Sequence, residues 1–363
     1  MRTQSKKRTV KRPNSSKSNS APKKGNKKSS KNKKMKRKYI LYIIEFVLLL
    51  ILIPIGFLYY KLGEISSYDI DETAIATNDF YDKNMDNYTT IALFGVDSRE
   101  NDLRENTRTD CIIVASINKK TKDVKLASIY RDTFVYINDV GYTKINHAYS
   151  HGGPEMALTT LNRNFDLNIT DFITINFSAL SNIIDALGGV DIKITEDELK
   201  YVNAYARDVA KINNTTVEKI PSAGLHTLSG VQATGYCRVR YTSGGDFTRS
   251  QRQRTVLNQI VKKATSANPV TLYKIMDEIL PQIYTSLDTN ELVKLCSGAP
   301  FYSVKEDFGF PFEKSTPKIN GASVVTAETL SSNVIALHEK LYGTTDYTPS
   351  STVEYRSNEI AGM

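Results

Sequence analysis

The strongest restriction on the architecture of this chain is a run of apolar residues near its N-terminus. Residues Tyr39–Tyr60 are almost entirely Ile, Leu, Val, Phe and Tyr, with Glu45, Pro54 and Gly56 as exceptions. A helix of this length reaches about 33 Å at about 1.5 Å per residue, enough to cross a bilayer core. Tyrosines at both ends are typical of a membrane interface. No small-residue cleavage site follows, so the run predicts a transmembrane signal anchor at 39–60 rather than a removable signal peptide.

The distribution of charge predicts the orientation of this anchor. Residues 1–38 contain 17 Lys or Arg and no Asp or Glu, which leaves 31 basic and 39 acidic residues in the rest of the chain. The positive-inside rule therefore places a disordered basic arm, 1–38, in the cytoplasm, against membrane lipid, and everything after residue 61 outside the cell membrane. Because the excess of positive charge belongs to the arm, we expect no specific nucleic-acid partner for the body.

The remaining chain divides by composition into three parts. Residues 61–88 are polar and acidic and are predicted to form a stalk, residues 89–343 a compact extracytoplasmic body, and residues 344–363, rich in Thr, Ser and Pro, a flexible tail. Three cysteines with no CxxC pair exclude a disulfide scaffold and argue against a zinc ribbon. A disulfide between Cys111 and Cys237 is left open.

Alternating segments predict an α/β body with a mixed central sheet flanked by helices. The predicted strands are Thr89–Val96, Cys111–Ile117, Val124–Tyr130 and Asp191–Ile194. The predicted helices are Pro154–Asn164, Phe177–Leu187, Glu196–Lys211, Leu272–Tyr284, Asn290–Cys296 and Ala327–Tyr342, so that residues 270–343 are expected to be mostly helical. A turn composition at 118–123 predicts a hairpin. If the first two strands also pair antiparallel, Asp97, Asp110 and Arg131 meet at one end of the sheet.

A basic segment at 235–259 predicts an anion site. Arg238 and Arg240 are two apart in a run that we interpret as a strand, so both would point to one face. Asp246 is the expected N-cap of the following helix. One face of that helix carries three long polar side chains: Arg249, Arg252 and Gln253. Arginines beside a positive helix end suit a phosphate. The alternative is a solvated helix start with ordinary ion-pair partners.

The aspartates at the strand ends have two interpretations. Asp97 and Asp110 could hold Mg²⁺ together with water and substrate phosphates, the usual mode of binding for that ion. Alternatively, one caps a loop and the other pairs with Arg99 or Arg108. Arginines nearby favour the metal interpretation, because they indicate an anionic ligand at the same place.

The ordered motifs of the body resemble one known family. The segments IALFGVDSR, TRTDCIIVASIN, SIYRDTFV, KINHAY, GLHTLSG, YCRVRY and GGDFTRSQRQR, within residues 89–264, are similar to those of the LytR-CpsA-Psr family. The arm and single anchor also fit that family. The resemblance implies an α/β fold with an apolar groove for a polyprenyl tail, which we expect at residues 177–187 and the sheet face beneath. It also implies a phosphotransferase acting on undecaprenyl-pyrophosphate-linked glycopolymers such as teichoic acid or capsular polysaccharide.

The resemblance carries over to individual residues. Asp97 and Asp110 match the carboxylates that bind Mg²⁺. The residues implied to lie at the pyrophosphate are Arg99, Arg108, Arg131, Lys144, Arg238, Arg240, Arg249, Arg252 and Gln253. Arg131 is also placed in the catalytic set, and the proton acceptor is left open among Asp110, Asp132 and Asp246.

The predicted reaction is attack of a peptidoglycan hydroxyl on the phosphorus that carries the glycopolymer, with undecaprenyl phosphate as the leaving group. Two alternatives stay open. The same site with water as acceptor would be a polyprenyl-pyrophosphate hydrolase, and a non-enzymatic membrane regulator or attenuator would use the arm in the cytoplasm. The sequence does not name the glycopolymer, the oligomeric state or any redundancy with related enzymes.

Overall fold

The computed structural model describes residues 56, 60, 72–80, 82–96, 103, 107–268, 271, 274–275 and 282–363. The predicted arm and nearly all of the predicted anchor at 39–60 lie outside this part of the chain. Within it, the search for a helix of sufficient length and hydropathy to span a bilayer finds none. The elements described below belong to one unit, residues 57–363.

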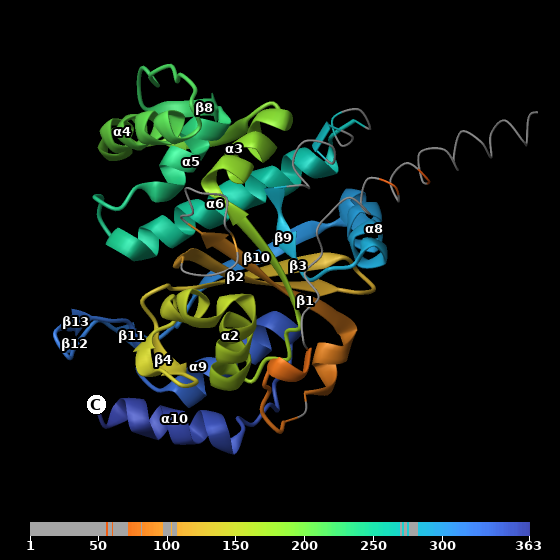
Figure 1. The fold of residues 1–363 in the computed structure, drawn as a ribbon, viewed down its shortest axis with the longest axis vertical. Helices are drawn as coiled ribbons and strands as arrows, with labels where there is room; N and C mark the ends of the chain where they lie inside the picture. Colours follow the sequence, from red (N-terminus) through yellow and green to blue (C-terminus); the bar gives the residue numbers. More distant parts are fainter. Residues whose placement is uncertain are drawn as a thin grey trace, which may run out of the picture. The chain divides into compact units, whose positions relative to one another are not determined.

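A six-stranded mixed sheet forms the centre of this unit (Figure 1). Its strands, in spatial order, are β10 (Ser303–Phe310), β3 (Asp123–Ile129), β2 (Thr109–Asn118), β1 (Tyr88–Val96), β6 (Asp171–Asn176) and β9 (Tyr284–Thr285). The pairs β1–β2 and β2–β3 are antiparallel, as predicted, whereas β1–β6 and β3–β10 are parallel. The predicted mixed α/β fold is thus confirmed for the described residues.

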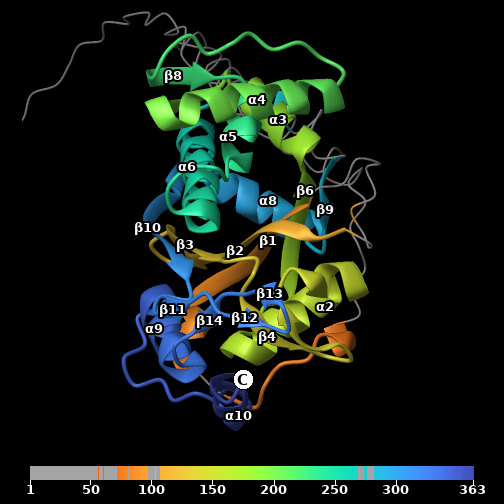
Figure 2. The ribbon, with the colours of Figure 1, turned by 90° about the vertical axis from the view of Figure 1, so that its left-hand side faces the viewer.

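Helices cover both faces of the sheet (Figure 2). Those on one face are α3 (Phe177–Ala186), α4 (Glu196–Ile212), α5 (Gly230–Arg238), α6 (Gly245–Thr265) and α8 (Thr289–Gly298). Those on the other are α2 (His147–Phe165), α9 (Leu330–Tyr342) and α10 (Ser351–Ala361). Four short strand pairs lie apart from the central sheet: β4 (Phe134–Ile137) with β5 (Gly141–Lys144), β7 (Val190–Ile194) with β8 (Gly224–Leu228), β11 (Lys314–Ser315) with β14 (Thr326–Ala327), and β12 (Lys318–Ile319) with β13 (Ala322–Ser323). The 3-10 turns are η1 (Glu72–Ala74), η2 (Lys83–Asn87) and η4 (Ala299–Phe301).

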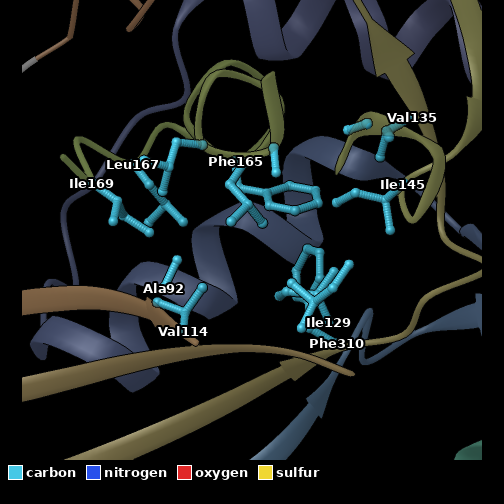
Figure 3. Close-up of a cluster of buried hydrophobic side chains, with 14 of the residues drawn as sticks. Ala92, Val114, Ile129, Val135, Ile145, Phe165, Leu167, Ile169 and Phe310 are labelled. Carbon is cyan, nitrogen blue, oxygen red and sulfur yellow. The ribbon is translucent and has the colours of Figure 1, made fainter. Parts of the chain in front are cut away.

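Strand periodicity divides the apolar residues between two cores. Successive side chains of a strand point to opposite faces, so Ala92 and Phe94 join the core beneath α2 and α9, while Ile91 and Leu93 face the other side. Figure 3 shows part of the first core, where Phe165 and Leu167 meet Val114 of the sheet. Both sheet faces are therefore covered by helices.

Helix α3 begins and ends as its sequence predicts. The Asn176 side chain accepts a hydrogen bond from the amide of Ala179 at 2.8 Å, which caps the first turn. After the helix, Gly188 and Gly189 both have positive φ, and a Cβ at Gly189 would lie 2.7 Å from the carbonyl oxygen of Leu228. The two glycines thus allow the chain to turn directly into β7.

The edge strand β10 corrects the prediction that 270–343 is mostly helical. Its sequence, SVKEDFGF, places Lys305, Glu306 and Asp307 consecutively, and half of its residues are exposed. A charged edge strand lacks the apolar run by which a buried strand is recognised. Pairing with β3 is what makes this segment a strand.

The predicted flexible tail at 344–363 is wrong, and part of the predicted stalk also belongs to the body. Helix α10 buries Val353 and Ile360 in the main core. The Asp166 carboxylate accepts hydrogen bonds from the Ser350 amide at 2.7 Å and from Asn78 Nδ2 at 2.6 Å, so it holds both ends of the body. The Ser and Thr residues that suggested disorder serve here as caps and hydrogen-bond donors.

Candidate active site

The candidate site begins at an irregularity where β1 and β2 end. The pairing register shifts between Gly95 and Val96, so that Gly95 faces Cys111 and Val96 faces Thr109. Asp110 lies between these paired positions. A bulge of this kind redirects a side chain at the end of a sheet and is frequent beside active sites. A Cβ at Gly95 would lie 2.9 Å from that of Cys111, so the close approach of the two strands requires glycine.

Three arginines surround Asp110. Arg131, two residues after β3, places Nη1 2.8 Å from Asp110 Oδ1, and Arg249 of α6 places Nη2 2.7 Å from Oδ2. Arg240, in the loop between α5 and α6, has Nη2 3.3 Å from the same oxygen. Asp246 completes this cluster, with Oδ2 2.8 Å from Arg131 Nε. The predicted meeting of Asp110 and Arg131 is confirmed; Asp97 and Arg99 lie outside the described residues.

The cluster carries an excess of positive charge. Burial alone would raise the pKa of Asp110, but Arg249, Arg131 and Arg240 outweigh it and hold the pKa below its ordinary value. Conversely, burial together with Arg249 and Arg131 lowers the pKa of Arg240. Three guanidinium groups facing two carboxylates leave one positive charge uncompensated. The arrangement therefore suits an anion with several oxygens.

An apolar groove opens beside this cluster. It has a volume of about 230 Å³ and lies between the sheet and helices α3, α5 and α6. Its lining includes Ile175, Leu180 and Ile183, and at one end Asp110 and Gln253. Gln253 Nε2 donates to the Asp110 carbonyl oxygen at 3.4 Å. The groove lies where the sequence predicted one. Its polar end is next to the arginine cluster, so the charged head and the apolar tail of an anionic lipid could bind side by side.

A second, polar cavity of about 400 Å³ has Arg131 in its lining. It gathers Arg108, Asp132, Lys144 and His147. Lys144 Nζ is 3.1 Å from Asp132 Oδ1. The predicted residues Arg108, Asp132 and Lys144 thus share a cavity with Arg131, next to the Asp110 cluster, whereas His147 was not singled out from the sequence. Burial, aided by Arg108 and His151, lowers the pKa of His147.

Two arginines predicted for the anion site have other partners. Arg238 is the last residue of helix α5, not part of a strand, and its guanidinium lies over the rings of Phe177 and Tyr205 at 4.9 and 5.7 Å. Arg252 pairs with Glu198 at 2.8 Å and also donates to the Val239 carbonyl. The predicted strand at Arg238 is wrong, because helix α5 extends to this residue, and Arg252 is paired because α4 supplies a carboxylate next to it.

Two further details of the predicted segment change. The N-cap of α6 is Gly244, with φ of 85°, and Asp246 lies in the first turn with its carboxylate on Arg131 rather than on the backbone. Glu198 was not singled out from the sequence, although Thr195 and Glu198 form the capping box of α4, a pattern that the sequence displays. Cys111 and Cys237 both line the groove as free thiols, which answers the question of their pairing.

The fold and the site together define a class: an α/β protein with an arginine–aspartate cluster at the mouth of an apolar groove. Comparison with known proteins agrees. The model of the LytR_cpsA_psr family matches residues 58–333. The chain therefore belongs to this family.

Relatives with curated names include polyisoprenyl-teichoic acid–peptidoglycan teichoic acid transferases. TagU of Enterococcus faecalis is 31% identical over 224 residues, 60% of this chain and 68% of TagU. TagT of Bacillus subtilis is 29% identical over 217 residues, 59% of this chain and 63% of TagT, so the chain spans less than two thirds of that relative.

Solved structures share the fold. TagT bound to LIIa-WTA has a TM-score of 0.58 at 22% identity, covering 76% of this chain and all of the TagT chain. TagT with bound octaprenyl pyrophosphate lipid has a TM-score of 0.55 at 21% identity, with the same coverage.

Proposed function

We propose that this chain is a Mg²⁺-dependent phosphotransferase. It would move a glycopolymer of the teichoic acid or capsular polysaccharide type from undecaprenyl pyrophosphate to a peptidoglycan hydroxyl. One observation carries the proposal: Arg131, Arg240 and Arg249 converge on Asp110 at the polar end of an apolar groove. A lipid diphosphate has the same division into charged head and apolar tail. The transferase names of the curated relatives support the same activity.

The positions of the donor follow from the charges. The polyprenyl tail would lie among Ile175, Leu180 and Ile183, where each buried methylene contributes about 0.8 kcal/mol. The diphosphate would contact Arg240 and Arg249. Their guanidinium groups are already oriented by carboxylates, so little reorganisation is needed when negative charge grows on the phosphate oxygens. The neighbouring polar cavity, which includes Arg131, would leave room for the saccharide and the acceptor.

The residues present fit Mg²⁺ only in part. Asp110 is ionised at neutral pH because the arginines hold its pKa down, as a metal ligand requires. Within the described residues, no group of three His, Cys, Asp or Glu side chains could hold a metal ion. Mg²⁺ commonly uses one or two carboxylates with substrate phosphates and water. Asp110 with Asp97, which lies outside the described residues, would supply such a pair. Bound there, Mg²⁺ would neutralise charge on the phosphates.

In the proposed reaction, the acceptor hydroxyl oxygen forms a bond to the phosphorus attached to the glycopolymer. The bond from that phosphorus to the bridging oxygen breaks, and undecaprenyl phosphate leaves with the electron pair. The hydroxyl proton goes to a carboxylate. Asp132, which lines the polar cavity beside Arg131, would take this proton, with Asp246 as the alternative. The arginines around Asp110 hold its pKa below the ordinary value, which disfavours Asp110 itself as the proton acceptor.

The experiment uses the full chain in membrane vesicles with a polyprenyl-pyrophosphate-linked saccharide, Mg²⁺ and peptidoglycan oligomers. Mass spectrometry detects a saccharide joined to the oligomer by a phosphodiester. We expect product from the wild type, none with EDTA, and none from Arg131→Ala, while the exposed Arg207→Ala serves as the matched control. Release of lipid phosphate without the joined product would identify a hydrolase instead. Turnover by Arg131→Ala at the wild-type rate would contradict the assigned role.

The proposed reaction places the body outside the cell membrane, where peptidoglycan lies, with a single anchor at 39–60 and the arm 1–38 in the cytoplasm. Labelling of intact cells tests this arrangement. A membrane-impermeant amine reagent should modify exposed lysines of the body and leave those of the arm unmodified until the cells are lysed.

A further inference from the structure

A third cavity lies away from the Asp110 cluster, where the β4–β5 hairpin, α2 and α10 meet. Its volume is about 520 Å³. The hairpin supplies Tyr136 and Tyr142, α2 supplies Arg163, and α10 supplies Arg356 and Tyr355. Helix α10 follows the part of the chain that matches the family model, residues 58–333. The cavity therefore exists only because the C-terminal helix packs against the family domain.

Polar atoms around this cavity lack hydrogen-bond partners. Within the described residues, Arg163 Nε, Arg356 Nη1 and Tyr142 Oη are buried and have no partner. The Arg356 side chain belongs to a residue that is only 4% exposed, and its guanidinium lies 5.0 Å from the ring centroid of Tyr136. Buried N–H and O–H groups are ordinarily paired. Three such groups at one cavity indicate a ligand that accepts hydrogen bonds.

The charge of the cavity defines this ligand further. No ion pair of Arg163 or Arg356 is found in the described part of the chain, and the carboxylate in the lining is Glu359. The negative charge of Asp166 also acts on Arg356, but the oxygens of Asp166 already accept hydrogen bonds from Asn78 and Ser350. Burial, followed by the charge of Arg163, lowers the pKa of Arg356 to about 10. A positive charge destabilised in this way gains from a bound anion.

The walls favour a saccharide as the carrier of the anionic group. The rings of Tyr136, Tyr142 and Tyr355 and the side chains of Ser351 and Thr352 line the cavity, in place of the aliphatic side chains of the lipid groove. Tyrosine offers both an apolar face and a hydroxyl, which match the C–H and O–H groups of a sugar. We propose that this cavity binds the phosphate group of a phosphorylated saccharide, with Arg163 and Arg356 as its ligands.

The cavity adjoins the active site. Tyr142 lines both this cavity and the polar cavity that contains Arg131. A polymer with phosphate groups that extends from Arg131 past Tyr142 would present a second phosphate to Arg163 and Arg356. The identification of the ligand as the glycopolymer itself rests on the proposed function, whereas binding of a sugar phosphate does not.

The test follows the arginines directly. Full-length protein in detergent micelles is labelled with ¹⁵N at arginine Nε, and the resonances of Arg163 and Arg356 are assigned from their Gln variants. N-acetylglucosamine 1-phosphate is the probe, with N-acetylglucosamine and inorganic phosphate as comparisons. We expect both resonances to shift saturably with the sugar phosphate at millimolar concentration, more weakly with inorganic phosphate, and not with the neutral sugar.

Variants make the result decisive. Arg163→Gln should weaken binding, read at Arg356, by about tenfold or more, since one charge-assisted hydrogen bond is lost. Tyr142→Phe removes only the hydroxyl and should weaken it less, whereas Arg207→Gln, on the exposed face of α4, should leave it unchanged. An absent shift, an equal response to the neutral sugar, or equal affinity for inorganic phosphate would overturn the proposal. Because the signals report binding at this cavity, a failure of transfer activity leaves the result interpretable.

Discussion

Two arginines three residues apart on α6 should fail in different ways when replaced. Arg249 and Arg252 are both almost fully buried, with 2% and 3% of their side chains exposed. Arg249 contacts Asp110 and Asp246, while Arg252 contacts Glu198. We therefore predict that Arg249→Gln chiefly removes catalysis and that Arg252→Gln chiefly removes stability.

The expected effects of Arg249→Gln on stability and on kcat follow from the contacts that Asp110 keeps after the substitution. Asp110 keeps Arg131 at 2.8 Å and Arg240 at 3.3 Å, so the loss of one charged hydrogen bond should cost about 1–3 kcal/mol of folding free energy. Loss of one oriented donor to the phosphate should lower kcat by about 10²–10³. Arg249 also makes the largest favourable contribution to the low pKa of Asp110. Its removal raises that pKa, so the acid limb of the pH–rate profile should move to higher pH.

The expected loss of stability for Arg252→Gln depends on Glu198, which would lose its ion-pair partner. The Glu198 side chain is 9% exposed and would keep only the hydrogen bonds of its capping box. Removing one member of a buried pair typically costs about 3–5 kcal/mol. Urea unfolding followed by circular dichroism measures this cost, and turnover per folded molecule is measured below the unfolding transition. Arg249→Lys keeps the charge but loses the forked geometry of the guanidinium group, so its activity should lie between those of the wild type and Arg249→Gln.

One result would refute this reasoning. If folded Arg252→Gln turned over as slowly as Arg249→Gln while its unfolding free energy stayed at the wild-type value, the ion pair with Glu198 would not be structural, and the separation of the two arginines would be wrong.

Three further predictions follow. Ile183→Glu places a charge in the lipid groove and should raise KM at least tenfold for a long polyprenyl donor but little for a short-chain analogue, as steady-state kinetics can show. Truncation after residue 343 removes the buried Val353 and Ile360 and should cost at least about 3 kcal/mol in urea unfolding; an unchanged midpoint would contradict the packing of α10. Burial raises the pKa of Cys111 to about 12 and that of Cys237 still further, so neither should react with iodoacetamide at pH 8 until the protein unfolds.

Much of the sheet is encoded locally. The apolar runs of β1, β2 and β3 and the turn composition between β2 and β3 predict the antiparallel order that the structure shows. The meeting of Asp110 and Arg131 follows from strand direction alone, because antiparallel neighbours bring the start of one strand to the end of the next. The end of α3 is likewise written in Gly188 and Gly189.

Other features depend on contacts between distant segments. Strand β10 carries too many charges to be recognised alone and becomes a strand by pairing with β3. The C-terminal segment reads as polar and loose, yet Asp166 and the main core hold α10 in place.

The different partners of Arg249 and Arg252 show most clearly what cannot be predicted from local sequence. The sequence by itself places Arg249 and Arg252 on one helix face and beside a run of arginines, and so determines that a cationic cluster exists. Only the tertiary structure decides that Arg249 faces Asp110 and that Arg252 faces Glu198. The reason is physical: a buried charge takes whichever opposite charge the packing brings within a few ångströms, and packing is not a local property of the sequence.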